Sequence, residues 1–112
     1  MRAHDYERAR KTAEAGLEFA PGDAALVALR GEAKAGLADA EGALADWGRA
    51  LELDPEDIGP LYSTAFLLER TDRPAEAIAA WQSIVEWNEA RALALESEWP
   101  KRELERLRAA AP

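Results

Sequence analysis

The chain has 112 residues, no cysteine, and 14 Lys and Arg against 22 Asp and Glu, which gives a formal net charge of -8. This length fits one domain with a modest core, and the lack of cysteine excludes disulfides and thiolate metal sites. The acidic balance disfavours nucleic acid and anionic membranes as partners, and because no run resembles a signal peptide or a membrane span, we expect a cytoplasmic protein.

The first predicted element is a helix over residues 3–19, ended by Pro21 and Gly22. No partner helix precedes it in the sequence. Arg10 stands where the later segments carry large apolar residues, so we expect this helix to be a polar cap rather than the cut edge of a longer array. Its packing face is formed by Tyr6, Ala9, Ala13, Leu17 and Ala20.

A helix pair is predicted next, over residues 24–37 and 40–53. Asp23 is placed to accept hydrogen bonds from the free amides of its first turn. Gly31 lacks a side chain and allows a neighbouring helix to approach closely. Residues 36–39 provide the turn between the two helices.

A second pair begins with a helix over residues 58–70, capped by Asp57 and carrying Pro60 in its first turn, where proline is tolerated. Residues 71–74 break the chain. From there we predict one long helix over about residues 75–96, stopped at Trp99 and Pro100.

A short closing helix is predicted over about residues 101–110, with Leu104 and Leu107 for packing. In an alternative interpretation, the preceding helix ends near Asn88 and a new one starts at Glu89.

The central stretch of the chain is an internal repeat with a period of about 34 residues. Residues 9–21 also match the second half of the unit, so the chain holds two whole units and one half. Pairs that match across the period are Asp23 and Asp57, Ala43 and Ala77, Trp47 and Trp81, and Glu52 and Glu86.

A unit of this length built from two helices resembles the tetratricopeptide repeat, and residues 41–55, with the terminating Asp54 and Pro55, match it best. The resemblance covers about residues 3–87 and implies an all-α, right-handed α-solenoid of about two and a half units plus a C-terminal capping helix. The single domain would contain a half repeat at 3–22, a repeat at 23–56, a repeat with an extended second helix at 57–88, and a cap at 89–112.

Arg30 and Lys34 depart from this family, which usually keeps apolar or aromatic residues at their positions. We expect their stems to lie across apolar surface with the charges in water.

The family chiefly binds other proteins, in a concave groove lined by the first helix of each unit. Tyr62 and Phe66 are the expected aromatic anchors of that groove; in an alternative, the C-terminal helix folds back and covers them. We expect a protein or peptide ligand that is apolar with basic flanks, matching Glu32 and Glu69. The predicted groove residues are Ala25, Ala28, Glu32, Ala35, Tyr62, Phe66, Glu69 and Arg70.

One subclass of the family binds the C-terminal carboxylate of chaperones through a clamp of lysine, asparagine and arginine. Ala28, Glu32, Tyr62 and Phe66 occupy comparable places here, so that activity is not expected.

The four tryptophans fall into two groups. Trp47 and Trp81 occupy matched positions and are predicted to be core residues, as is Trp87. Trp99, beside Pro100, either tucks under the last helix or lies exposed.

Chemistry-bearing residues are sparse. His4 is the only histidine, and residues 54–57 have the acids but not the ligand spacing of a calcium loop; they are interpreted as a helix stop followed by a cap. We therefore predict no catalysis, cofactor or metal. The function predicted is that of a monomeric protein-interaction module; the alternative is a structural unit that completes its repeat stack with a second copy.

Overall fold

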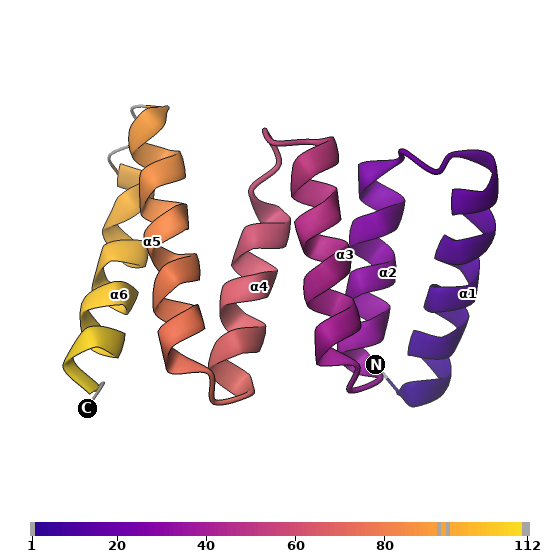
Figure 1. The fold of residues 1–112 in the computed structure, drawn as a ribbon, viewed down its shortest axis with the longest axis horizontal. Helices are drawn as coiled ribbons and strands as arrows, with labels where there is room; N and C mark the ends of the chain where they lie inside the picture. The colour runs from indigo at the N-terminus through magenta and orange to yellow at the C-terminus, as the bar shows by residue number, and fades with distance from the viewer. Residues whose placement is uncertain (1, 92, 94, 111–112) are drawn as a thin grey trace. The chain divides into compact units, whose positions relative to one another are not determined.

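The computed structural model describes residues 2–91, 93 and 95–110, and this part of the chain is all-helical (Figure 1). It contains six α-helices and one short 3-10 helix, with no strand among the described residues. The chain divides into two compact units, Met1–Pro60 and Leu61–Pro112. The prediction of an all-α fold is confirmed.

The first unit contains α1 (Ala3–Phe19), α2 (Ala24–Gly36) and α3 (Ala40–Leu53), and consecutive helices run antiparallel (Figure 1). The three predicted ranges agree with these bounds to within one residue. The carboxylates of Asp23 and Asp39 accept hydrogen bonds from first-turn amides, at 3.1 Å from Leu26 N and 3.0 Å from Gly42 N. These side chains satisfy amides that have no partner inside the helix, so the starts of α2 and α3 are set locally.

One indole forms the centre of the first unit. Trp47 is 2% exposed, which confirms its predicted burial. A Cβ atom on Gly31 would lie 2.8 Å from Trp47 Nε1, so glycine is what admits the indole against α2. The small apolar residues buried in this unit are Ala13, Val27, Ala33, Ala43 and Ala50.

A buried carboxylate joins α2 to α3. Asp46 of α3 is 5% exposed, and its oxygens lie 2.8 Å from Arg30 Nη2 and 3.1 Å from Lys34 Nζ. The hydrogen bonds from Arg30 raise the pKa of that guanidinium above its ordinary value. The sequence placed both charges in water; both side chains stay partly exposed, but their charged ends also pair with the buried Asp46, which the sequence did not predict.

The second unit contains α4 (Gly59–Arg70) from residue 61 onward, α5 (Pro74–Ala90), the 3-10 helix η1 (Leu95–Ser97) and α6 (Glu98–Ala110). Trp81 is 0% exposed, which confirms its predicted burial. Trp87, also predicted to be core, is half-buried beneath the Arg91 guanidinium, 3.7 Å from the ring centroid. The apolar residues buried with Trp81 are Ala65, Leu67, Leu68, Ala77, Ala80, Ile84, Val85 and Leu104.

The long helix predicted over residues 75–96 is wrong. α5 ends at Ala90, near the end that the alternative placed at Asn88. Asn88 is 3% exposed; its carbonyl accepts a hydrogen bond from Leu93 N at 2.9 Å, and its Nδ2 donates to Glu96 O at 3.2 Å. These bonds hold the chain in a turn, and the helix does not continue.

The start of the closing helix also differs from the prediction, because α6 begins at Glu98 rather than at residue 101 or at Glu89. Pro100 is the third residue of α6. A first-turn amide has no partner inside the helix, so its absence in proline costs no helical hydrogen bond. Trp99 and Pro100 are therefore part of the first turn of α6 and not a stop signal.

The turns between α2 and α3 and between α4 and α5 have the same backbone conformation. Ala38 and Asp72, which are one repeat period apart, have positive φ angles of 64° and 54°. This left-handed residue after a helix, with the bonds that accompany it, is a common helix end. The sequence repeat is thus also a repeat of helix-turn-helix pairs. Three backbone hydrogen bonds recur: Leu37 N to Ala33 O, Ala38 N to Ala35 O and Asp39 N to Lys34 O in one turn, and Thr71 N to Leu67 O, Asp72 N to Glu69 O and Arg73 N to Leu68 O in the other.

Candidate functional site

The predicted groove residues of the first unit lie along one side of α2. Ala25 and Glu32 are exposed, whereas Ala28 and Ala35 are half-buried. Their spacing of three and four residues places them on one face of the helix. Apart from Glu32, this row consists of alanine side chains, which provide little apolar contact area.

The predicted groove residues of the second unit lie on α4. Tyr62 and Glu69 are half-buried, Arg70 is exposed, and Phe66 is 43% exposed. The interior of the unit takes the other face of the helix, where Ala65, Leu67 and Leu68 are buried. This row therefore presents large aromatic surface next to charge.

Four rings of the second unit form an aromatic cluster, composed of Tyr62, Phe66, Trp81 and Trp99. Trp99 stacks on Tyr62, with ring centroids 6.1 Å apart and planes at 9°, and lies 5.8 Å from Phe66. Trp81 meets the other three edge-to-face at 5.2 to 5.9 Å. Such edge-to-face and offset contacts are favourable beyond the area they bury, so the rings support one another.

The sequence left open whether Trp99 is exposed and whether the C-terminal helix covers Tyr62 and Phe66, and the structure decides both. Trp99 is 41% exposed, so it both packs against neighbouring rings and remains accessible. α6 covers Tyr62 and Phe66 only in part, through Trp99, because Phe66 keeps 43% of its surface exposed. Phe66 and Trp99 are thus the accessible members of the aromatic cluster.

Glu69 is held from two sides. Its Oε2 accepts a hydrogen bond from Trp81 Nε1 at 2.8 Å, and its Oε1 lies 2.6 Å from Arg106 Nη2 of α6. Arg106 also donates to Glu103, at 2.7 Å and 3.0 Å, and these bonds, followed by that to Glu69, raise the pKa of Arg106 above its ordinary value. Glu69 therefore joins α4, α5 and α6, and it shares the guanidinium of Arg106 with Glu103.

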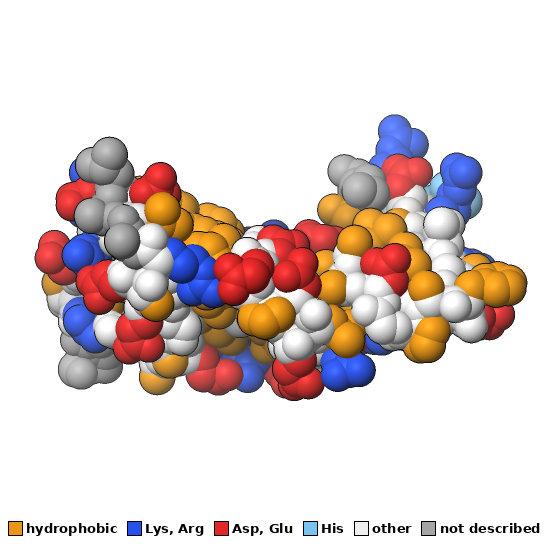
Figure 2. All heavy atoms as spheres, turned by 90° about the horizontal axis from the view of Figure 1, so that it is seen from above, with side chains coloured by type: hydrophobic (Ala, Val, Ile, Leu, Met, Phe, Trp, Pro, Cys, Tyr) orange, Lys and Arg blue, Asp and Glu red, His pale blue; other side chains and the backbone are white. Residues whose placement is uncertain are grey.

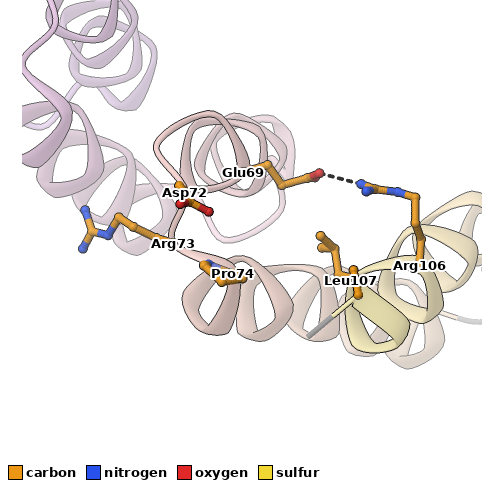
Figure 3. A pocket seen from close by; sticks show the side chains of 7 residues that line it. Glu69, Asp72, Arg73, Pro74, Arg106 and Leu107 are labelled. Atoms are coloured by element: carbon orange, nitrogen blue, oxygen red, sulfur yellow. Dashed lines mark hydrogen bonds and ion pairs between the residues drawn. The ribbon is translucent and has the colours of Figure 1, made fainter. Parts of the chain in front are cut away.

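A cavity of about 380 Å³ lies beside this ion pair, between the α4–α5 turn and the end of α6. Figure 3 shows the Glu69–Arg106 bridge at one side of it and the Arg73 guanidinium pointing away. Arg73 pairs with Glu76 at 2.8 Å. The lining residues are Glu69, Asp72, Arg73, Pro74, Arg106, Leu107 and Ala110.

The face drawn in Figure 2 has no large patch of a single charge. Figure 2 shows acidic and basic side chains intermixed there, with hydrophobic side chains between them. A ligand would therefore meet local charges near its contact point rather than a uniform acidic face, and salt screens the more distant ones.

The described residues contain no group of three or more His, Cys, Asp or Glu side chains arranged to hold a metal ion. In the acidic stretch at residues 54–57, Asp54 accepts a hydrogen bond from Glu56 N at 3.2 Å and Asp57 one from Gly59 N at 2.9 Å. This agrees with its interpretation as a helix stop followed by a cap. Within the described part of the chain, no helix combines the length and the apolar character needed to cross a membrane.

Comparison with known proteins assigns no family. No protein-family model matches the chain, and no curated protein matches it significantly. The case for a function therefore rests on the repeat and on the aromatic cluster.

Proposed function

We propose that this chain is a non-catalytic protein-interaction module of tetratricopeptide type, a right-handed solenoid that binds a peptide or helix of a partner protein. The repeated turn, with the same left-handed residue and the same three hydrogen bonds, supports this assignment. The close approach of Trp47 to Gly31 supports it further, as does the burial of Ala65 and Trp81 at the equivalent positions one repeat period later.

The observation that carries the binding role is the exposure of Phe66 and Trp99. These rings touch, with centroids 5.8 Å apart, and are 43% and 41% exposed. Adjoining large apolar side chains at a surface are typical of interaction sites, and aromatic residues are favoured anchors because they bury much area while ordering few torsions. The charged groups around them are guanidiniums and carboxylates, of which Glu69, Glu103 and Arg106 bind one another, rather than a nucleophile beside a base.

The test is a selection of random 16-residue peptides displayed on phage, with the full chain as bait. We expect enriched sequences for the native chain and none for the double variant Phe66→Ala, Trp99→Ala. Phe19→Ala is the matched control, since Phe19 is 90% exposed and lies in the other unit. Circular dichroism should give the same helical signal for all three proteins.

Equal enrichment with the native chain and the double variant would move the interaction surface away from the aromatic cluster. Absence of any enrichment with the native chain would contradict the peptide-binding function itself.

A self-associating structural unit is the second candidate. The observation that favours it is Phe19, which is exposed to 90% at the end of α1. We nevertheless propose a monomer, located in the cytoplasm. Light scattering across a concentration series should give a constant monomer mass; a dimer that Phe19→Ser dissociates would favour the second candidate.

A further inference from the structure

Two exposed arginines flank the aromatic cluster. Arg70 follows Phe66 by four residues on α4, and Arg102 follows Trp99 by three residues on α6, so each lies about one turn from an exposed ring. Within the part of the chain that the structure describes, neither guanidinium has an ion-pair or hydrogen-bond partner. Both are therefore available to a ligand seated on Phe66 and Trp99.

Two of the three acids near the same rings share one guanidinium. Glu69 and Glu103 both bind Arg106, at 2.6 Å and 2.7 Å. Glu98, beside Trp99, is the first residue of α6, where the free amides of the helix N-terminus favour a negative charge. Beside the exposed rings, the described charged side chains without an ion-pair partner are thus two cations, Arg70 and Arg102, and one anion, Glu98, although the whole chain carries -8.

We infer that the aromatic cluster binds an apolar peptide segment with acidic side chains on its flanks. This rests on the proposed function and specifies its ligand. The rings take the apolar anchor, while Arg70 and Arg102 take carboxylates, for which the planar guanidinium is well suited. The sequence-based preference for basic flanks depended partly on Glu69, and at the aromatic cluster that carboxylate is already bound to Arg106.

The net charge of the chain acts against an acidic ligand only at long range. At physiological ionic strength, charges more than about 8 Å apart are largely screened, whereas a carboxylate in contact with a guanidinium is not. Beside the rings, Arg70 and Arg102 outnumber the single unpaired acid, Glu98, and therefore set the preference of a bound ligand, while the distant acids slow its approach.

The test uses three synthetic 16-residue peptides that share one Leu-rich and Trp-containing core and carry Glu, Gln or Lys on both flanks. Fluorescence anisotropy with the full chain at low salt should rank them Glu, Gln, Lys, with about a 10-fold difference in Kd between the extremes. The difference should shrink as salt is added.

The variant Arg70→Glu, Arg102→Glu should reverse that order. Arg8→Glu, Lys11→Glu is the matched control, because it changes the net charge equally through two exposed side chains of α1, and it should leave the order intact. Tighter binding of the Lys peptide to the native chain, no discrimination, or no binding of the Glu peptide would each overturn the inference. In that case, the proposed function still stands if the random selection enriches peptides that bind the native chain and not the Phe66→Ala, Trp99→Ala variant. If the selection enriches no such peptides, the proposed function and this inference both fail.

Discussion

The helix pairs α2–α3 and α4–α5 share a turn and a buried tryptophan, and they differ in what surrounds that tryptophan. In the first pair, the residue before Trp47 is the buried Asp46, which forms ion pairs with Arg30 and Lys34. The equivalent positions of the second pair, one repeat period later, are Ala80, Thr64 and Leu68. The two helix pairs thus have the same turn but different packing at these positions. An ion cluster around the buried Asp46 joins the helices of the first pair, and smaller or apolar side chains occupy the same positions in the second.

A second difference concerns the indole nitrogen. Trp81 Nε1 donates to Glu69 at 2.8 Å. Trp47 Nε1 is buried and has no hydrogen-bond partner among the described residues, because the position equivalent to Glu69 is Ala35. Glu69 also binds Arg106, so the same carboxylate that satisfies Trp81 fastens α6 to the unit.

The two pairs also differ in the size of the side chains that they expose. The pair held by ions has small side chains on the outward row of α2, at Ala25 and Ala28. The second pair, whose helices pack through apolar side chains, carries Tyr62 and Phe66 on the equivalent face and adds Trp99 from α6. The two pairs therefore share a turn conformation and differ in the side chains that they expose, and the proposed binding role rests on this difference.

The largest expected effect is that of removing each tryptophan. Trp81→Ala and Trp47→Ala should each lower the free energy of unfolding by about 3 to 5 kcal/mol, the range for large buried aromatic residues. Trp81→Ala should be the more damaging, since it also leaves Glu69 without its indole partner and Tyr62, Phe66 and Trp99 without their common support. Urea denaturation followed by circular dichroism measures both. A loss below about 1 kcal/mol would contradict the burial of that tryptophan.

The ion cluster provides a prediction in two steps. Asp46→Ala should cost about 1 to 3 kcal/mol, because it leaves Arg30 and Lys34 without their carboxylate, although both are partly exposed and can reach water. The triple variant Arg30→Thr, Lys34→Leu, Asp46→Ala installs the residues of the second pair. Replacing a whole buried ion group by well-packed residues is often neutral or stabilising, so the triple variant should recover most of the loss in the same urea experiment. A triple variant less stable than Asp46→Ala would show that the two frames are not interchangeable.

The sequence predicted the first four helices and the start of α5 well because these limits are local. Asp23 caps α2, and Pro74 opens α5, each through contacts within a few residues. The end of α5 was missed because it depends on Asn88, whose side chain bonds to Glu96 O eight residues away. Pro100 has the sequence pattern of a stop signal, but a proline in the first turn fits a helix as well as one after its end.

In the candidate site, helical periodicity alone predicted where two aromatic side chains lie on α4. The spacing of Tyr62 and Phe66 placed both off the core face of α4, and the structure leaves Phe66 43% exposed. The contribution of Trp99 and the pairing of Glu69 with Arg106 depend on how α6 folds back, and the latter joins residues 37 positions apart. No local pattern encodes such a contact.

Gly31 tests how tightly the first pair is built around Trp47. Gly31→Ala introduces the residue type found at the equivalent Ala65, but its Cβ would lie 2.8 Å from Trp47 Nε1 and 3.2 Å from Asp46 Cβ. We expect a net loss of about 1 to 2 kcal/mol in thermal or urea unfolding, since crowding outweighs the roughly 1 kcal/mol by which alanine favours a helix. The control is Gly48→Ala, where a Cβ meets nothing within 4 Å and helix propensity should raise stability. An increase in stability for both variants would contradict the close approach at Gly31.

The smallest effect is expected from supplying the missing hydrogen bond. Ala35→Glu places in the first pair the carboxylate that Glu69 provides in the second, within reach of the buried Trp47 Nε1 if the two frames are equivalent. A hydrogen bond of this kind contributes about 0.5 to 1.5 kcal/mol net, and the gain should fall in the lower half of that range because no residue equivalent to Arg106 has been added. In a Trp47→Phe background, which has no indole N–H, the same substitution should give no gain. The difference between the two backgrounds, measured as a double-mutant cycle in urea, isolates the bond from any change in helix propensity or surface charge. A cycle energy near zero would mean that the side chain at position 35 does not reach the indole, and that the two pairs differ in helix placement as well as in side chains.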